Sequence, residues 1–469
     1  MKPAAKYACI LLFALLVVGL RAIHLDSDPP SWLSWSSGIY TDEGIYASDA
    51  RSVVLFGHWS AGDFHSAEIA PVHHLLLMAV FRLLGVSLTS ARLVSVLASL
   101  GTLLFLYLTL KVQYNSRTAI YAVIFLALSP VALFYSRLAL LETPTALLLT
   151  FALYLIVSKK PNWLTGIVLA LAVCCKPLAL FCVPAFFIDF RRFPAQVLQR
   201  FATFIAGLAA FFLTWQVPHH TDLGRLNKYY LWHQYLPHST LQLEHNLFRS
   251  LWSGSSDGIL PYLIHHEPLL LLALILALFS KPVKEDLTLR LYAVWLAVPA
   301  LAFCLMSYEP SRYFILFWPA LAALAAVVIS KSERRLQAPY IAVFLVWSLA
   351  ISLPSIVHPT FSLRDAGVSL GRDLPQSTTI VGQYAPEFAL SNSLHSVYVQ
   401  PGLANTKTNI QSSVILITKS PYWDNYWTTR TSGALNPIPA VCFNLPHNQI
   451  ISGWQYSNEL PRASSEISF

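Results

Sequence analysis

Charged side chains are scarce in this sequence. Asp, Glu, Lys and Arg make up 12% of its 469 residues, whereas an ordinary soluble domain contains about 25%. Hydrophobic residues make up 55%, and the mean hydropathy is +0.55. Apolar runs of roughly 20 residues, the length that crosses a bilayer, recur along residues 1–357. The composition therefore excludes a wholly soluble protein and indicates an integral membrane protein.

Cysteines are also few, and the sequence contains no internal repeat or low-complexity segment. Five of the six cysteines lie in or beside apolar segments, so Cys442 is alone in the polar C-terminal part and no disulfide framework is available there. Cys174 and Cys175 are adjacent, which is typical of core packing and not of metal ligation. The net charge of +8 does not indicate a nucleic-acid partner, because Lys and Arg cluster in short loops between apolar runs, where membrane topology accounts for them.

The first apolar segment, "YACILLFALLVVGL", follows Lys2 and Lys6 and has no small-residue cleavage site. This pattern favours a retained anchor with a cytoplasmic N-terminus. The later apolar runs then give about eleven spans, with the basic loops on the cytoplasmic side. Residues 163–190 are expected to form a hairpin of two short spans with "CCKP" near its outer apex, and residues 71–86 an interfacial helix in the first outer loop. If the hairpin were one span instead of two, the predicted side of the membrane would be reversed for every later loop.

The predicted fold is thus an α-helical polytopic membrane protein with a small soluble domain. Residues 1–357 form the multi-pass transmembrane domain. Residues 358–469 alternate β-rich runs such as "STTIVGQ", "HSVYVQ" and "SSVILITK" with helix-like segments, which predicts an extracytoplasmic α/β domain. Several Tyr and Trp residues in the loop 218–266 are typical of an interfacial aromatic belt, and stacking on a sugar or lipid headgroup is the alternative.

Topology leaves a second set of charges unexplained, because they fall at the outer ends of spans. They are Asp42, Glu43, Arg137, Glu142, Lys176 and Arg312. Ionisable groups at membrane depth are costly and tend to be paired or functional. Each also has a structural interpretation, as a solvated loop acid, a structural ion pair, a snorkelling lysine or a span anchor. Their shared side of the membrane predicts one outward-facing cavity that holds both acids and bases.

Such a mixture suits the transfer of a sugar from a lipid phosphate. A carboxylate can take the proton of a hydroxyl nucleophile, while two or three cations hold the phosphate leaving group. Because phosphate leaves readily, one base suffices, unlike the two carboxylates of glycoside hydrolysis. Three pairs of adjacent histidines, at 73–74, 219–220 and 265–266, lack zinc-site spacing and are expected to be interfacial. A divalent cation held by Asp42 or Glu43 is an open alternative.

At these residues the sequence resembles the polyprenyl-phosphate-sugar glycosyltransferases of the GT-C superfamily, in the branch of protein O-mannosyltransferases and aminoarabinose transferases. The similar segments, in order over about 330 residues, are "TDEGIYASDARSVVLFGHW", "APVHHLLLMAVFRLLGVSLTSARLVSVL", "SPVALFYSRLALLETPTALLLTFAL", "LTGIVLALAVCCKPLAL" and "SRYFILFWPALAALAA". The resemblance implies that Asp42 is the general base and that Glu43 orients the site or a metal. It also implies that Arg137, Lys176 and Arg312 lie near the lipid phosphate, with Glu142 in the same cavity.

Two features depart from the family pattern. "EIAPVHH" places Glu68 before the proline and His73 and His74 after it, so the family's acceptor contacts do not carry over, and the C-terminal part has no signature of the large lumenal domains of protein mannosyltransferases. Asp49 and Arg51 are expected to be helix-surface charges.

The expected protein is a plasma-membrane transferase acting on the extracytoplasmic face. It would move a sugar from a polyprenyl-phosphate donor to a lipid, glycan or protein acceptor. The alternatives are an oligosaccharide polymerase or ligase, for which an outer loop rich in His from His219 to His245 would be typical, and a non-catalytic transporter of lipid-linked sugars.

Overall fold

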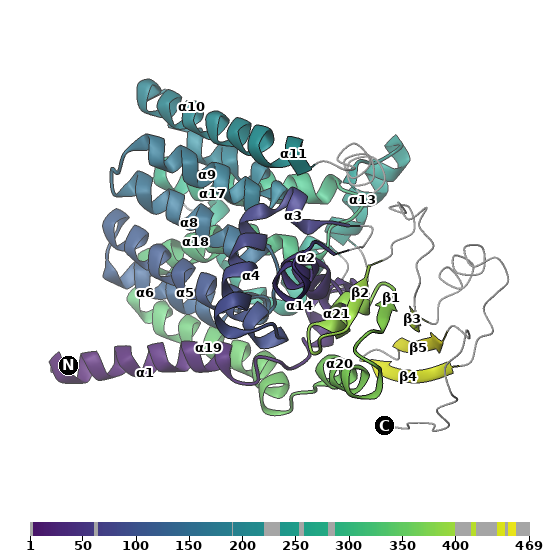
Figure 1. The fold of residues 1–469 in the computed structure, drawn as a ribbon. Coiled ribbons are helices and arrows are strands. Elements are labelled where there is room, and N and C mark those ends of the chain that lie inside the picture. Colours follow the sequence, from purple (N-terminus) through teal and green to yellow (C-terminus); the bar gives the residue numbers. More distant parts are fainter. Residues whose placement is uncertain are drawn as a thin grey trace.

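The computed structural model describes residues 3–60, 64–189, 191–219, 235–252, 258–279 and 287–398, together with three strands at 414–418, 439–445 and 449–455. Residues 1–357 are mostly helical, and the strands lie at the end of the molecule opposite the N-terminus of the first helix (Figure 1). Of the aromatic residues predicted as an interfacial belt, Tyr229, Tyr230 and Trp232 fall outside the described residues. Tyr235 is described, and its hydroxyl lies 3.2 Å from that of Tyr313.

The helices of the first half, in chain order, are α1 (Pro3–Ala22), α2 (Asp42–Phe56), α3 (Ser66–Ile69), α4 (Pro71–Leu84), α5 (Leu88–Gln113), α6 (Ser116–Leu128), α7 (Pro130–Tyr135), α8 (Glu142–Val157), α9 (Asn162–Cys175), α10 (Pro194–Phe211) and α11 (Val217–His219). Short turns are η1 (Ser31–Leu33), η2 (Ser37–Tyr40), η3 (Pro177–Phe181), η4 (Val183–Phe187) and the π-turn η5 (Phe212–Gln216). The second half contributes α13 (Thr240–Trp252), α14 (Ile259–His266), α15 (Pro268–Phe279), α17 (Leu287–Leu305), η7 (Ser311–Leu316), α18 (Trp318–Lys331) and α19 (Arg334–Val357).

Among the described residues, three helical stretches are long and apolar enough to cross a membrane, or four if one bent pair counts as a span. They are Leu88–Gln113, Pro194–Gln216 and Arg334–Asp373, and the bent pair, α14 with Pro268–Ala277, turns by 116°. Seven shorter apolar helices accompany them, α4 and α9 included. The chain is therefore a helical protein rich in membrane-type segments, and the eleven spans stay a prediction.

Local sequence explains several boundaries. Gly85 ends α4 with a φ of 82°, a conformation that glycine adopts without strain, and Ser87 then begins α5 with a capping box in which Ser87 and Ser90 satisfy each other's backbone N–H groups. In the predicted hairpin, α9 is followed by the 3₁₀ turns η3 and η4, both of which begin at a proline-containing step. Proline lacks the N–H that a regular helix needs, which accounts for the irregular second arm.

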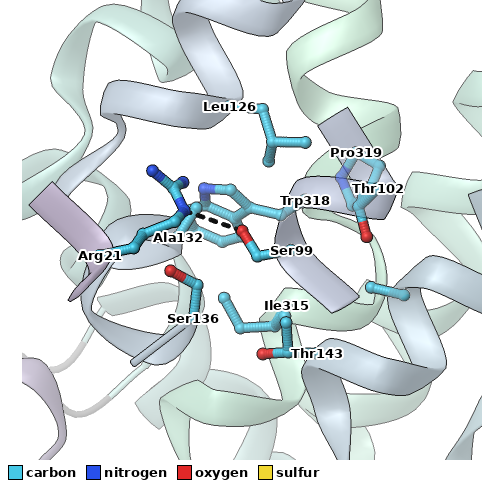
Figure 2. Close-up of a pocket in the computed structure, with 11 residues that line it drawn as sticks. Arg21, Ser99, Thr102, Leu126, Ala132, Ser136, Thr143, Ile315, Trp318 and Pro319 are labelled. Carbon is cyan, nitrogen blue, oxygen red and sulfur yellow. Dashed lines mark hydrogen bonds between the residues drawn. The ribbon is translucent and has the colours of Figure 1, made fainter. Parts of the chain in front are cut away.

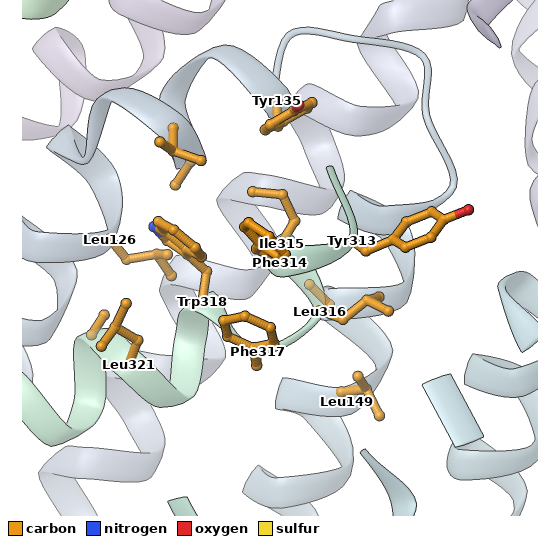
Figure 3. Close-up of a cluster of buried hydrophobic side chains, with 14 of the residues drawn as sticks. Leu126, Tyr135, Leu149, Tyr313, Phe314, Ile315, Leu316, Phe317, Trp318 and Leu321 are labelled. Carbon is orange, nitrogen blue, oxygen red and sulfur yellow. The ribbon is translucent and has the colours of Figure 1, made fainter. Parts of the chain in front are cut away.

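The core of the helical part is built around η7, whose six residues are all buried. Its Phe314, Ile315 and Leu316 lie among side chains of α6, α7, α8 and α18 (Figure 3). Indole N–H groups lock the segment on both sides: Trp295 donates to the Leu316 carbonyl at 3.0 Å, and Trp318 donates to Ser129 Oγ at 2.9 Å. Since Arg312 is the second residue of η7, this packing fixes the position of its backbone.

The C-terminal part contains α20 (Ser362–Asp373), α21 (Ala385–Ala389) and the strands β1 (Thr379–Val381), β2 (His395–Val397), β3 (Val414–Thr418), β4 (Pro439–Leu445) and β5 (Gln449–Gln455). The strand order is β2-β1-β3-β5-β4. β1 pairs in parallel with β2 and β3, whereas β5 pairs antiparallel with β3 and β4. The first three strands lie in the three segments for which the sequence predicts strands.

Candidate active site

Helix α2 presents two consecutive carboxylates to two different partners. Asp42 and Glu43 form its first turn, where the helix dipole favours negative charge. Successive residues of a helix are rotated by about 100°, so the two side chains leave the helix in different directions. Asp42 faces η7, and Glu43 faces α5.

Asp42 is the first of four side chains whose charges alternate in sign. Its Oδ2 lies 2.7 Å from Arg312 Nη2, and Arg312 Nε lies 3.6 Å from Glu142 Oε1 at the start of α8. Lys176, in the bend after α9, places Nζ 2.8 Å from the same Glu142 oxygen. Four residues that are far apart in the sequence thus form one cluster of two acids and two bases.

The cluster is buried unequally. The side chains of Glu142, Lys176 and Arg312 are at most 4% exposed, whereas Asp42 is 14% exposed. Asp42 is therefore the member of the cluster that a molecule from outside can reach most easily. Burial raises the pKa of Asp42 above its usual range, and the Arg312 guanidinium opposes that shift.

Tyrosine rings cover the two cations. Lys176 Nζ lies 4.7 Å from the centre of the Tyr313 ring and 5.6 Å from that of Tyr46, and the Arg312 guanidinium lies 5.2 Å from the Tyr313 ring. Cation–π contacts hold positive charge without using up hydrogen-bond donors. Arg312 Nη1 and Glu142 Oε2 are buried and have no hydrogen-bond partner in the ranges that the structure describes. The cluster therefore keeps unused polar capacity of the kind that a ligand would satisfy.

Glu43 lies outside this cluster. Both of its oxygens accept from Arg92, with Oε1 2.8 Å from Nε and Oε2 2.5 Å from Nη2, and Oε1 also accepts from the Ala139 backbone N–H at 2.6 Å. Arg92 further donates to the carbonyl oxygens of Leu25 and Ser27. Glu43 thereby ties α2 to α5 and to the loop before α8, a role that no local sequence signal reveals.

Arg137 also lies apart from the four-residue cluster. Its guanidinium donates to the carbonyl oxygens of Leu20, Ile23 and His24 at 2.6–2.8 Å. These carbonyls belong to the last turn of α1 and the turn after it, where cations stabilise a helix end. Within the described part of the chain Arg137 makes no ion pair with Asp42 or Glu142. The structure therefore brings together four of the six predicted site residues, and Glu43 and Arg137 have other partners.

Two expectations about surface charge are wrong. Asp49 accepts from the Ala67 N–H at 3.3 Å and lies 2.9 Å from His65 Nδ1, and Arg51 donates to three carbonyls of the C-terminal part, so both side chains are buried. His73 and His74 are likewise buried beneath α2 and are not interfacial. Charged residue types favour a surface position, but here other segments of the protein cover these side chains and supply their partners.

The donor sets do not fit a divalent cation. In the ranges that the structure describes, no group of three or more His, Cys, Asp or Glu side chains is close enough to hold a metal ion. Both oxygens of Glu43 are occupied by Arg92, and Asp42 faces a guanidinium.

A small polar cavity lies deeper in the helical part, lined by Arg21, Ser99, Ser136, Thr143 and apolar neighbours that include Trp318 (Figure 2). The space open to the centre of a water molecule is about 30 Å³, which is enough to hold ordered water. Arg21 donates from Nε to Ser99 Oγ at 2.9 Å and from Nη2 to the Ala127 carbonyl at 3.1 Å. The residues that line this cavity differ from the four of the cluster around Asp42.

Comparison with known proteins gives two kinds of match. Residues 68–219 match the family of dolichyl-phosphate-mannose-protein mannosyltransferases. The fold is similar to ArnT from Cupriavidus metallidurans, both bound to undecaprenyl phosphate (TM-score 0.63) and in the apo state (TM-score 0.64), each at 13% identity and covering 96% of this chain and 98% of that chain. It is also similar to the oligosaccharyltransferase AglB from Archaeoglobus fulgidus in complex with an inhibitory peptide and a dolichol-phosphate, with a TM-score of 0.50, 10% identity and coverage of 98% of this chain and 75% of that chain.

No curated protein matches the sequence significantly. At identities this low, the structural matches show a shared fold. Together with the family match, they confirm the resemblance to GT-C glycosyltransferases that use polyprenyl-phosphate sugars.

Proposed function

We propose that this protein transfers a sugar from a polyprenyl-phosphate donor to an acceptor hydroxyl on the extracytoplasmic face of a membrane, with Asp42 as general base. One observation carries the proposal: Asp42 shares a buried cluster with Arg312, Lys176 and Glu142, so a base and two cations lie together. The structural neighbours with bound undecaprenyl phosphate or dolichol-phosphate support a lipid-phosphate donor.

The roles follow from the charges. Arg312 and Lys176 would hold the phosphate of the donor, because a guanidinium and an ammonium both form strong hydrogen bonds to phosphate oxygens. Glu142 contacts both cations and would keep them aligned, as their spacing to one carboxylate oxygen suggests. Asp42, at the more exposed edge, would face the acceptor.

In the transfer step, Asp42 takes the proton of the acceptor hydroxyl while the oxygen of that hydroxyl attacks C1 of the sugar. The bond from C1 to the phosphate oxygen breaks on the opposite side, and the phosphate keeps the electron pair. Configuration at C1 inverts, and Arg312 and Lys176 stabilise the additional negative charge on the leaving phosphate.

Donor binding would also prepare the base. Arg312 is paired with Asp42 at 2.7 Å, which makes that carboxylate a poorer proton acceptor. A phosphate that draws Arg312 toward itself would weaken this pair and leave Asp42 free to accept a proton. Base activation would then depend on a bound donor, which disfavours unproductive chemistry at an empty site.

The test is the isosteric Asp42→Asn variant, with Asp49→Asn, another buried acid of α2, as the matched control. Membranes containing each protein are incubated with labelled polyprenyl-phosphate sugars, and the label is followed into acceptors. Loss of a general base lowers kcat by about 10²–10⁴-fold, while donor binding is kept. The control should retain most of its activity.

Normal turnover by a purified, folded Asp42→Asn protein would refute the assignment of the base. If a labelled donor crosses the bilayer of proteoliposomes intact and no acceptor is labelled, the protein is a transporter and not a transferase. No step of the proposal uses a metal, so addition of a chelator should leave transfer unchanged.

A further inference from the structure

We propose that Glu387, from the C-terminal part, is a positioning residue that holds the first turn of α2 and thereby the direction of Asp42. The inference rests on the proposed function for its catalytic consequence, but its structural content is independent of that function. It makes the C-terminal part a component of the active site.

Glu387 provides a cap that α2 lacks in its own sequence. The first backbone N–H groups of a helix have no partner within the helix, and the side chain at the N-cap position, Thr41, caps none of them. Asp42 and Glu43 are engaged by arginines. The Gly44 N–H instead donates to Oε2 of Glu387 at 2.6 Å, and Glu387 lies 343 positions later in the chain.

The contact between the two helices requires glycine at position 44. A Cβ atom placed on Gly44 would overlap the backbone of Glu387 and of Pro386. α21 therefore rests directly on the backbone of the turn that bears Asp42. A side chain at this position would force the two segments apart.

Arg51, two turns further along α2, fixes α21 from its other end. Its guanidinium donates to the carbonyl oxygens of Ala389 at 3.0 Å, Asn392 at 3.1 Å and Leu394 at 2.7 Å. The side chain of Glu387 is thus presented to Gly44 by a segment that is anchored at its C-terminal end, so the cap is rigid. In Figure 1, α21 lies beside α2 at the junction of the helical part and the strands.

The carboxyl group of Glu387 is almost fully buried. Burial and the nearby Glu43 raise the pKa of Glu387 well above its usual range. An amide has the same shape as a neutral carboxyl and keeps an oxygen that can accept from Gly44. Glu387→Gln is therefore the conservative variant, and Glu387→Ala removes the cap.

The control must disturb the C-terminal part without touching α2. Asp28 meets this need, because its two oxygens accept from the backbone N–H groups of Ser362 and Leu363 at the start of α20, at 2.8 and 3.0 Å. Asp28→Ala removes an acid that links the loop after α1 to α20 and leaves the contact between Gly44 and Glu387 in place.

The experiment combines amide hydrogen exchange with kinetics on the full-length protein in nanodiscs. Glu387→Ala should speed exchange at residues 43–47 and lower kcat by about 10- to 100-fold, as expected for a misplaced catalytic group, with donor affinity nearly unchanged. Glu387→Gln should restore both readouts, and Gly44→Ala should reproduce the loss. Asp28→Ala should leave exchange at residues 43–47 as in the wild type.

Unchanged exchange at residues 43–47 in a folded Glu387→Ala protein would overturn the proposal, as would equal effects of Asp28→Ala and Glu387→Ala. A wild-type protein that transfers no sugar would refute the proposed function, whereas the exchange result would still decide whether Glu387 holds α2.

Discussion

Replacing Arg92 by Met removes the cation that neutralises Glu43 and leaves a carboxylate in a site where both side chains are at most 1% exposed. Breaking a buried ion pair by deleting one partner destabilises a protein by about 3–5 kcal/mol. The carbonyls of Leu25 and Ser27 would also lose a donor, at about 1–3 kcal/mol each if no other donor replaces Arg92. These costs are comparable to the whole stability of a domain, about 5–15 kcal/mol.

A second substitution separates the cost of the unpaired Glu43 charge from the cost of the lost hydrogen bonds. In the double variant Arg92→Met with Glu43→Leu, no uncompensated charge remains, so about 3–5 kcal/mol is recovered, while the Ala139 N–H loses its acceptor at about 1–3 kcal/mol. The double variant should thus unfold with a free energy about 2 kcal/mol higher than that of Arg92→Met. Equilibrium unfolding of both proteins by SDS titration in mixed micelles measures the difference. If the double variant is no more stable than Arg92→Met, the uncompensated charge of Glu43 is not what destabilises Arg92→Met.

Three further changes test the site and the packing around it. Lys176→Met should weaken binding of a polyprenyl-phosphate donor by about 10- to 100-fold, because a charge-assisted hydrogen bond contributes about 1.5–3 kcal/mol, and an unchanged Kd would contradict its role. Since burial raises the pKa of Asp42, the active, deprotonated base is lost as pH falls, and kcat/KM should decline at a pH above about 4. Arg312→Gln removes the cation that lowers the pKa of Asp42, so the decline of kcat/KM on the acid side should move to higher pH. A decline that stays at the same pH would argue against Asp42 as the base. Gly166→Ala should lower the apparent Tm in detergent, because its Cβ would overlap Thr203 of α10, and an unchanged Tm would refute tight packing of α9 on α10.

Most of the candidate site could be found from the sequence because its charges break the membrane pattern. Asp42, Glu142, Lys176 and Arg312 stand out as ionisable groups at the outer ends of apolar runs, where burial without a partner is too costly. Arg137 stands out for the same reason, yet it satisfies carbonyls at the end of α1. A charge that breaks the pattern therefore indicates burial with a partner, and the sequence does not show whether that partner is a substrate or a helix end.

The partners of α2 were hidden for a different reason. Asp49 and Arg51 are charged residues of the kind usually found on helix surfaces, and the C-terminal segment around Glu387 carries no recognisable motif. The contacts of Gly44 with Glu387 and of Arg51 with Ala389 span more than 300 positions, so no local pattern can reveal them.

The amino-acid sequence is enough to indicate the class of the protein and the chemistry available to it. Apolar runs and their flanking charges predict helices in a membrane because unpaired backbone groups are costly in lipid for every residue, and the cost of burying a side chain depends on its type. Which acid meets which base depends on how the chain packs. Asp42 pairs with Arg312 while its neighbour Glu43 pairs with Arg92, and a C-terminal glutamate caps α2. Ion pairs and caps depend on the distance between atoms, and that distance is fixed by the packing of segments far apart in the chain.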